Sequence, residues 1–152
     1  MDPCRRGTRY ALLALTSLLS VAIPSLATAA PAVPGAVPQV ASFPAGEFCS
    51  FPIEVTFRDG TKLHKDRSRV FSTGPLSVTA TNLDSGASRT FNASGPTFRN
   101  GTLTGNALIG QLASRGVGPA FLIINRGRVT FNSDDTIRTI TGSQIDVCTA
   151  LS

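Results

Sequence analysis

Residues 51–57 read FPIEVTF. Every second side chain from Phe51 to Phe57 is apolar, while Glu54 and Thr56 between them are polar. Successive side chains of an extended chain point to opposite faces, so this period of two places the apolar groups on one side. The pattern predicts a β-strand with one buried face.

Glycine-containing turn signals follow this strand and recur along the chain. Asp59-Gly60 comes first, and Asp-Gly favours a type I′ hairpin turn because both central residues take positive φ. We therefore expect an antiparallel return through residues 61–71. Further turns are predicted at Gly74-Pro75, Asp84-Ser85-Gly86, Gly95-Pro96, Asn100-Gly101, Asn125-Arg126-Gly127 and Ser133-Asp134-Asp135.

Two further features indicate how these strands pack. The unbroken apolar run of residues 120–124 predicts a strand buried on both faces or lying mid-sheet. Gly105 and Gly110 fall inside a longer predicted strand, and glycines there indicate bulges or sharp curvature. The tail, residues 143–150, is predicted to form a last strand or one short helical turn.

The expected fold class is all-β, with eight or nine short antiparallel strands. Strands at hairpin spacing are typical of a barrel or a sandwich. The interior glycines favour a small antiparallel β-barrel, because closing a sheet requires bends that glycine supplies. A β-sandwich is the alternative.

The N-terminus predicts a cleavable signal peptide over residues 1–29. Three arginines within the first nine residues precede an uncharged apolar run at residues 11–23, and Ala27-Thr28-Ala29 then forms an A-x-A site. The apolar run is shorter than the roughly 20 residues that cross a bilayer, which weighs against an uncleaved anchor. A twin-arginine signal is the other alternative, although the residues after the first arginine pair do not continue that pattern. We expect secretion to the extracellular space.

The rest of the chain is predicted to be a linker and one domain. Residues 30–46 are rich in Ala, Val and Pro and carry no charge, which indicates an extended linker. A single domain is then expected over residues 47–152. The predicted signal peptide removes three of the 14 basic residues and one of the nine acidic ones, leaving a net charge of +3. So mild a basic balance does not indicate a nucleic-acid binder.

Cysteine usage predicts one disulfide. Cys4 lies in the predicted signal peptide, whereas Cys49 and Cys148 bracket the domain of an exported chain. A redox or nucleophilic cysteine would need a C-x-x-C spacing or a neighbouring base, and the sequence shows neither. We expect Cys49 and Cys148 to be bonded.

No catalytic, cofactor-binding or metal-binding residue is expected. His64 is the sole histidine and lies among charged residues, which is typical of a solvated surface position. With both cysteines paired, few transition-metal ligands remain. The charged stretch from Arg58 to Arg69 could contact an acidic partner, but two acidic residues interrupt it and no aromatic residue is interleaved. We favour an edge strand protected by charge against aggregation.

Three segments give the chain a resemblance to known proteins. These are the start Phe48-Cys49-Ser50-Phe51-Pro52-Ile53, the strand Gly127-Arg128-Val129-Thr130-Phe131 and the close Ile145-Asp146-Val147-Cys148. With the signal peptide and linker, they resemble the small secreted proteins of unknown function that are common in actinobacteria. The resemblance implies export and a disulfide, and it brings no catalytic residues.

The function hypotheses follow from the apolar strand face. If a ligand is enclosed, alternation assigns it a set of interior side chains: Phe57, Val78, Phe91, Leu103, Phe121, Ile123 and Phe131. The first hypothesis is a secreted non-enzymatic β-domain that binds a small apolar ligand or a surface partner, with no nucleic acid and no transmembrane segment in the mature chain. The alternatives are a metal-independent barrel enzyme of cyclase or isomerase type and a structural cell-envelope protein.

Overall fold

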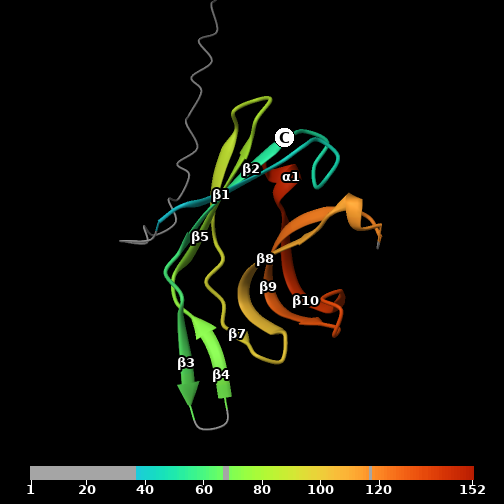
Figure 1. Cartoon of the computed structure of the whole chain (residues 1–152). Helices are drawn as coiled ribbons and strands as arrows, with labels where there is room; N and C mark the ends of the chain where they lie inside the picture. The colour runs from blue at the N-terminus through green and yellow to red at the C-terminus, as the bar shows by residue number, and fades with distance from the viewer. Residues whose placement is uncertain (1–36, 67–68, 117) are drawn as a thin grey trace, which may run out of the picture.

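The fold consists of two antiparallel β-sheets. A computed structural model describes residues 37–66, 69–116 and 118–152. The predicted signal peptide, and the first part of the predicted linker, lie outside the described residues. All strand pairings between the described residues are antiparallel, and the helical elements are one 3₁₀ turn and one α-helical turn (Figure 1). The prediction of an all-β antiparallel fold is confirmed.

The described residues form ten strands, which divide into a four-stranded and a six-stranded sheet. The four-stranded sheet has the order β1 (Gln39–Phe43), β2 (Ile53–Asp59), β5 (Leu76–Asn82), β6 (Ser88–Asn92). The six-stranded sheet has the order β10 (Ile137–Asp146), β9 (Phe121–Phe131), β8 (Thr102–Gln111), β7 (Thr97–Phe98), β4 (Arg69–Thr73), β3 (Lys62–Asp66). The turns of helix are η1 (Ala113–Arg115) and α1 (Val147–Ala150). Pairing among these strands leaves both sheets open at their edges.

One long two-stranded ribbon runs from the first sheet into the second. β2 pairs with β5 and β3 with β4 in a single register, so that Asp59 lies opposite Leu76 and Lys62 opposite Thr73. Between these pairs the Gly60 N–H donates to the Pro75 carbonyl over 2.8 Å. The ribbon bends here, and its outer half, the β3–β4 arm, projects from the body (Figure 1).

The hairpin predicted at Asp59-Gly60 is therefore wrong, because β2 and β3 follow one another along the same side of the ribbon. Gly74, opposite Thr61, has a φ of +148°, and a Cβ on it would lie 2.8 Å from the Gly60 carbonyl oxygen. Pro75 has no N–H to donate to the ladder. Glycine and proline thus mark a bend in a continuous ribbon.

The strands β8, β9 and β10 curl together around a row of glycines. Gly105, Gly127 and Gly142 lie directly opposite one another across the three strands. A Cβ on Gly127 would fall 2.0 Å from the Thr141 carbonyl oxygen, so only glycine permits this approach. The turn predicted at Asn125-Arg126-Gly127 is wrong, since β9 runs through it unbroken. The curvature predicted from the strand glycines is confirmed for β8, which curls strongly (Figure 1) and in which Gly105 has a φ of +79°.

Two hydrophobic cores lie on opposite faces of β9. The first fills the space between the sheets, with Leu122 and Ile124 of β9 packed among residues of the four-stranded sheet: Ile53, Val55, Val78, Ala80 and Phe91. The second contains Ile123 and Val129 of β9 with Ala107 and Ile109 of β8. The apolar run at residues 120–124 is therefore buried on both faces, as the sequence predicts.

The predicted linker contains the first strand. Gln39–Phe43 pairs with β2, with Ala41 opposite Val55, and the Phe43 ring meets Phe48 edge-on at 4.8 Å between centroids. Pro38 and Pro44 flank this strand but do not interrupt it, and an edge position tolerates proline at its ends. The linker prediction is wrong for this stretch, because it contains the edge strand β1.

The C-terminal segment closes the first core. Cys49 and Cys148 form the predicted disulfide, with 5.4 Å between their Cα atoms. β10 ends at Asp146, whose carboxylate accepts a hydrogen bond from the Thr149 N–H (2.7 Å) and so begins α1. The tail thus contains both of the predicted alternatives, a strand and then a helical turn.

Candidate functional site

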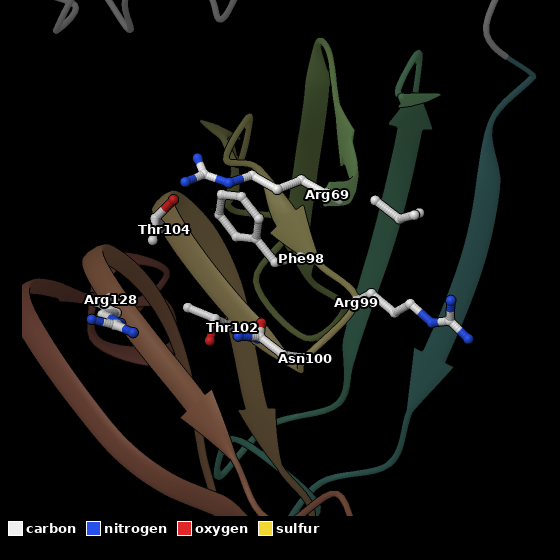
Figure 2. A pocket seen from close by; sticks show the side chains of 8 residues that line it. Arg69, Phe98, Arg99, Asn100, Thr102, Thr104 and Arg128 are labelled. Atoms are coloured by element: carbon white, nitrogen blue, oxygen red, sulfur yellow. The ribbon is translucent and has the colours of Figure 1, made fainter. Parts of the chain in front are cut away.

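A cleft of about 540 Å³ lies where the β3–β4 arm meets the curled strands (Figure 2). We call it the arginine cleft. Its lining comes from β4, from β7 and the turn after it, and from β8 and β9: Arg69, Val70, Phe98, Arg99, Asn100, Thr102, Thr104 and Arg128.

The floor of the arginine cleft is a polar strip of sheet. Thr102 and Thr104 stand two residues apart on β8 and therefore point to the same face. Arg128 of β9 lies directly opposite Thr104, so its guanidinium extends over the same face. Thr102 is buried and Thr104 half-buried, whereas Arg128 is exposed. Two hydroxyl groups and one exposed cation thus meet on the floor.

The Phe98 ring forms part of the opposite wall, and further rings stack behind it. Phe98 of β7 pairs with Phe71 of β4, with 5.9 Å between ring centroids, and His64 of β3 stacks on the other side of Phe71 at 5.4 Å. Figure 2 shows the Arg69 side chain passing beside the Phe98 ring. β4 and β7 pair through two residue pairs, and the contact between the Phe71 and Phe98 rings adds to this short pairing.

The turn between β7 and β8 fixes the mouth of the cleft. Phe98 accepts a hydrogen bond on its carbonyl from the Gly101 N–H (3.0 Å), and Gly101 has a φ of +74°. The Asn100 side chain accepts from the Thr102 N–H (3.2 Å), which holds its amide beside the floor. The turn predicted at Asn100-Gly101 is confirmed.

The electrostatic character of the cleft is positive. Among the described residues that line it, three are arginines and none carries a carboxylate. In Figure 2, Arg69 and Arg128 lie on the same side of Phe98 as Thr104, whereas Arg99 reaches to the opposite side. Arginine stays charged at every physiological pH and donates in a fork that matches carboxylate, sulfate or phosphate. The arrangement can therefore bind an anion.

One carboxyl group in the described part has a clearly shifted pKa, and it lies outside the arginine cleft. The Thr136 hydroxyl and then the Thr136 N–H donate to Asp134, and these hydrogen bonds lower the pKa of that carboxyl. Asp135 beside it has a φ of +61°. The pair serves the turn between β9 and β10, as the sequence predicts.

A second, smaller cleft of about 330 Å³ has an apolar character. We call it the phenylalanine cleft, because Phe43, Phe48 and Phe131 line it together with Leu112 and Ile137. Its polar lining residues are Gln111, Arg115, Asp135 and Thr136.

The seven side chains predicted to face a ligand do not share one interior. Phe57, Val78 and Phe91 belong to the first core or pack against it. The other four belong to or border the second core, on the opposite face of β9: Leu103, Phe121, Ile123 and Phe131. Of the seven, Phe131 also lines the phenylalanine cleft.

The charged stretch from Arg58 to Arg69 contains the edge strand that the sequence predicts. β3 is the outermost strand of the six-stranded sheet, and all five of its residues are exposed. His64 is one of them and contacts Phe71. Arg67 lies outside the described residues. Arg69, at the end of this stretch, is the member that reaches the arginine cleft.

Sequence reasoning missed Arg99 and Arg128 as site residues. Arg99 lies directly before the turn signal Asn100-Gly101, and Arg128 alternates with the core residue Val129. Both are therefore expected from the sequence to be ordinary outward-facing side chains. The available signal was that Arg126, Arg128 and Thr130 fall on one strand face without an acidic neighbour.

Within the part of the chain that the structure describes, no three His, Cys, Asp or Glu side chains gather as metal ligands would. In the same residues, no helix has the length and apolar character needed to cross a membrane. No family model, curated protein or solved structure matches this chain.

Proposed function

We propose that this protein is a secreted, non-enzymatic binding domain whose partner is anionic and is held in the arginine cleft. The observation that carries the proposal is that Arg69 and Arg128, from different strands, face the same space, while none of the described lining residues is a carboxylate. Export rests on the N-terminal pattern of basic, apolar and small residues. An anionic partner in this cleft is a specific case of the surface partner in the first hypothesis from the sequence.

The charge of this lining favours an anion as the partner. Two like charges that share a partly enclosed space repel one another, and a negatively charged group between them removes the repulsion. Charge-assisted hydrogen bonds from arginine are stronger than neutral ones. Thr102, Thr104 and Asn100 add neutral donors around the same space. Together they supply both the charge and the orientation that recognition of an anion requires.

The same lining supports binding rather than catalysis. General acid–base chemistry uses a group that titrates near the working pH, most often His, Asp, Glu, Cys, Lys or Tyr. None of the lining residues that the structure describes is of these types. His64 lies at the far end of the aromatic stack, with Phe71 between it and Phe98.

For the architecture of this domain we favour the β-sandwich over the barrel. The first core lies between residues of both sheets, which is the arrangement of a sandwich. The strong curl of β8, β9 and β10 is local to one sheet.

Replacing both cleft arginines tests the proposal. We expect R69Q/R128Q to bind dextran sulfate and polygalacturonate at least about tenfold more weakly, a loss of roughly 1.4 kcal/mol. The measurement is isothermal titration calorimetry at fixed ionic strength, because salt screens exposed charges. The matched control is R89Q/R115Q, which removes the same net charge outside the arginine cleft. An equal loss of affinity in both double variants would show that net charge alone drives binding.

A second candidate function is the binding of a small apolar ligand in the phenylalanine cleft. Three phenylalanines and Ile137 line a volume that suits a small molecule, and Phe131 is one of the side chains predicted to face a ligand. This cleft is the place where the small-ligand hypothesis can be tested.

For that second function, Nile red should bind saturably, and Ile137→Lys should abolish its fluorescence gain because a cation then enters the apolar lining. Leu63→Lys is the control, since Leu63 is 65% exposed on the arm. Circular dichroism verifies that both variants fold. Unchanged Nile red binding by Ile137→Lys would remove the phenylalanine cleft as its site.

A further inference from the structure

We infer that the anionic partner is an acidic polysaccharide, which extends from the arginine cleft across the outward faces of β8, β9 and β10. This inference rests on the proposed function and names the class of its ligand. It follows from three rows of polar side chains that continue the floor of the cleft.

The three rows are set by strand register. Thr130 of β9 lies opposite Thr102 of β8 and Thr139 of β10. The next row is Thr104, Arg128 and Thr141, and the third is Asn106, Arg126 and Ser143. Residues directly opposite one another in a sheet point to the same face, and so do residues two apart on one strand. These nine side chains therefore form one surface, which we call the outer polar face.

The position of the glycine row keeps this face free of the four-stranded sheet. On the same face of β9, Leu122 and Ile124 are buried in the first core. Beyond Ile124 the strand reaches the row at Gly127, where it curls, and Arg126 and Arg128 are exposed. The side of β9 that packs against the other sheet thus becomes a solvent-facing surface at its far end.

The chemistry of the outer polar face is uniform. Its nine side chains carry hydroxyl, amide or guanidinium groups, with no carboxylate among them. The Thr130 and Thr139 hydroxyl oxygens are 2.6 Å apart, and the Thr141 hydroxyl donates to the Arg128 carbonyl (3.3 Å). Ordered hydroxyl groups of this kind can exchange hydrogen bonds with sugar hydroxyls, each side donating and accepting.

The spacing of positive charge favours a repeating ligand over a compact anion. Arg126 and Arg128 are two residues apart on one strand face, a spacing of about 6.5 Å in extended chain. Arg69 adds a third charge from the cleft wall. Charges distributed along a surface suit a chain that carries a carboxylate or sulfate on successive units, because each added unit gains a further contact.

Two other anionic partners suit the surface less well. Single-stranded nucleic acid requires exposed aromatic faces on which bases stack, but the outer polar face has none and Phe98 is half-buried beside Phe71. A membrane surface would be met by large apolar side chains that enter the bilayer. The nine residues include no such side chain.

Chain length separates the polymer from a compact anion. With galacturonic acid and with an oligogalacturonide of about ten units, we expect calorimetry to give affinities that differ by clearly more than about tenfold, the factor that statistics alone supply. A sulfated dextran oligomer of the same length distinguishes sulfate from carboxylate as the anionic group. A single-stranded oligonucleotide and phosphatidylglycerol vesicles complete the series, and we expect both to bind more weakly than the better of the two oligosaccharides.

Two variants separate failure of this inference from failure of the proposed function. Arg126→Gln should lower the affinity for the oligosaccharide about threefold to tenfold, while the affinity for the single sugar acid stays unchanged. R69Q/R128Q should lower the affinity for the oligosaccharide and for the single sugar acid. Arg89→Gln is the charge-matched control for Arg126→Gln. If the oligogalacturonide binds only about tenfold more tightly than galacturonic acid, or less, which statistics alone supply, the polysaccharide inference is overturned. Weaker binding by R69Q/R128Q would in that case still support an anion site. Tighter binding of the oligonucleotide or the vesicles also overturns it. If R69Q/R128Q changes nothing, the proposed function itself fails.

Discussion

Removal of the Cys49–Cys148 disulfide should lower the free energy of unfolding by about 4 to 5 kcal/mol. The bond joins residues 99 positions apart, so it closes a long loop in the unfolded chain and restricts that chain strongly. In the folded state it ties the segment before β2 to α1, beside the buried Val147 and Leu151. The total free energy of unfolding of a domain is commonly roughly 5 to 15 kcal/mol, so the expected loss is a large share of the stability.

Urea unfolding followed by circular dichroism measures this loss. The double variant Cys49→Ala/Cys148→Ala and the reduced native protein should show the same decrease in unfolding midpoint. Added reductant should leave the midpoint of the double variant unchanged, which is the control. Equal midpoints for native and reduced protein would contradict the expected contribution of the bond.

Substitution of Gly127 by alanine should destabilise the protein by about 3 kcal/mol or more. The new Cβ would fall 2.0 Å from the Thr141 carbonyl oxygen and 2.8 Å from the Gly142 Cα. Both obstacles are backbone atoms of the neighbouring strand, which cannot move aside as the end of a side chain can. The curl that carries Arg126 and Arg128 away from the first core should relax in this variant.

Gly86→Ala is the matched control for that substitution. Gly86 has a φ of +74°, but a Cβ there would meet nothing within 4 Å. Its cost should be the conformational penalty alone, about 1 to 2 kcal/mol. Thermal and chemical unfolding of both variants give the comparison, and a smaller loss at Gly127 than at Gly86 would contradict the role of the glycine row.

The parts of the fold that sequence predicts correctly depend on local alternation or on counting. The period of two from Phe51 to Phe57, and the apolar run at residues 120–124, each report burial of their own strand. Two cysteines in the predicted mature chain permit a single intramolecular pairing, which the structure contains. None of these inferences requires knowing which strand lies beside which.

The wrong predictions concern strand partners. Asp59-Gly60 and Asn125-Arg126-Gly127 satisfy the rules for turns, but in the fold the first lies at a bend and the second within a continuous strand. Glycine is favoured wherever backbone segments approach closely, so its presence does not distinguish a reversal from a curl. The strand at Gln39–Phe43 was missed because the surrounding prolines and alanines determine the composition of that stretch.

The candidate site was the part of the molecule that was hardest to predict from the sequence. Arg69, Phe98 and Arg128 come together because β7 joins the β3–β4 arm to β8 through two residue pairs on one side and one on the other. Such short pairings leave no periodic pattern in the sequence. In the sequence Arg128 alternates with the core residue Val129, but the turn wrongly predicted at Asn125-Arg126-Gly127 hides that Arg126 lies on the same strand face.

The most direct test of the anion-binding cleft is a map of backbone amide shifts by NMR spectroscopy during titration with the oligogalacturonide. The expected result is a connected set of shifts at Arg69 and Val70, through the turn at Arg99 and Asn100, and along β8 and β9 to Arg126. The four-stranded sheet should be unaffected. Saturable shifts confined to that sheet or to the phenylalanine cleft, with none around Arg69 and Arg128, would contradict the assignment.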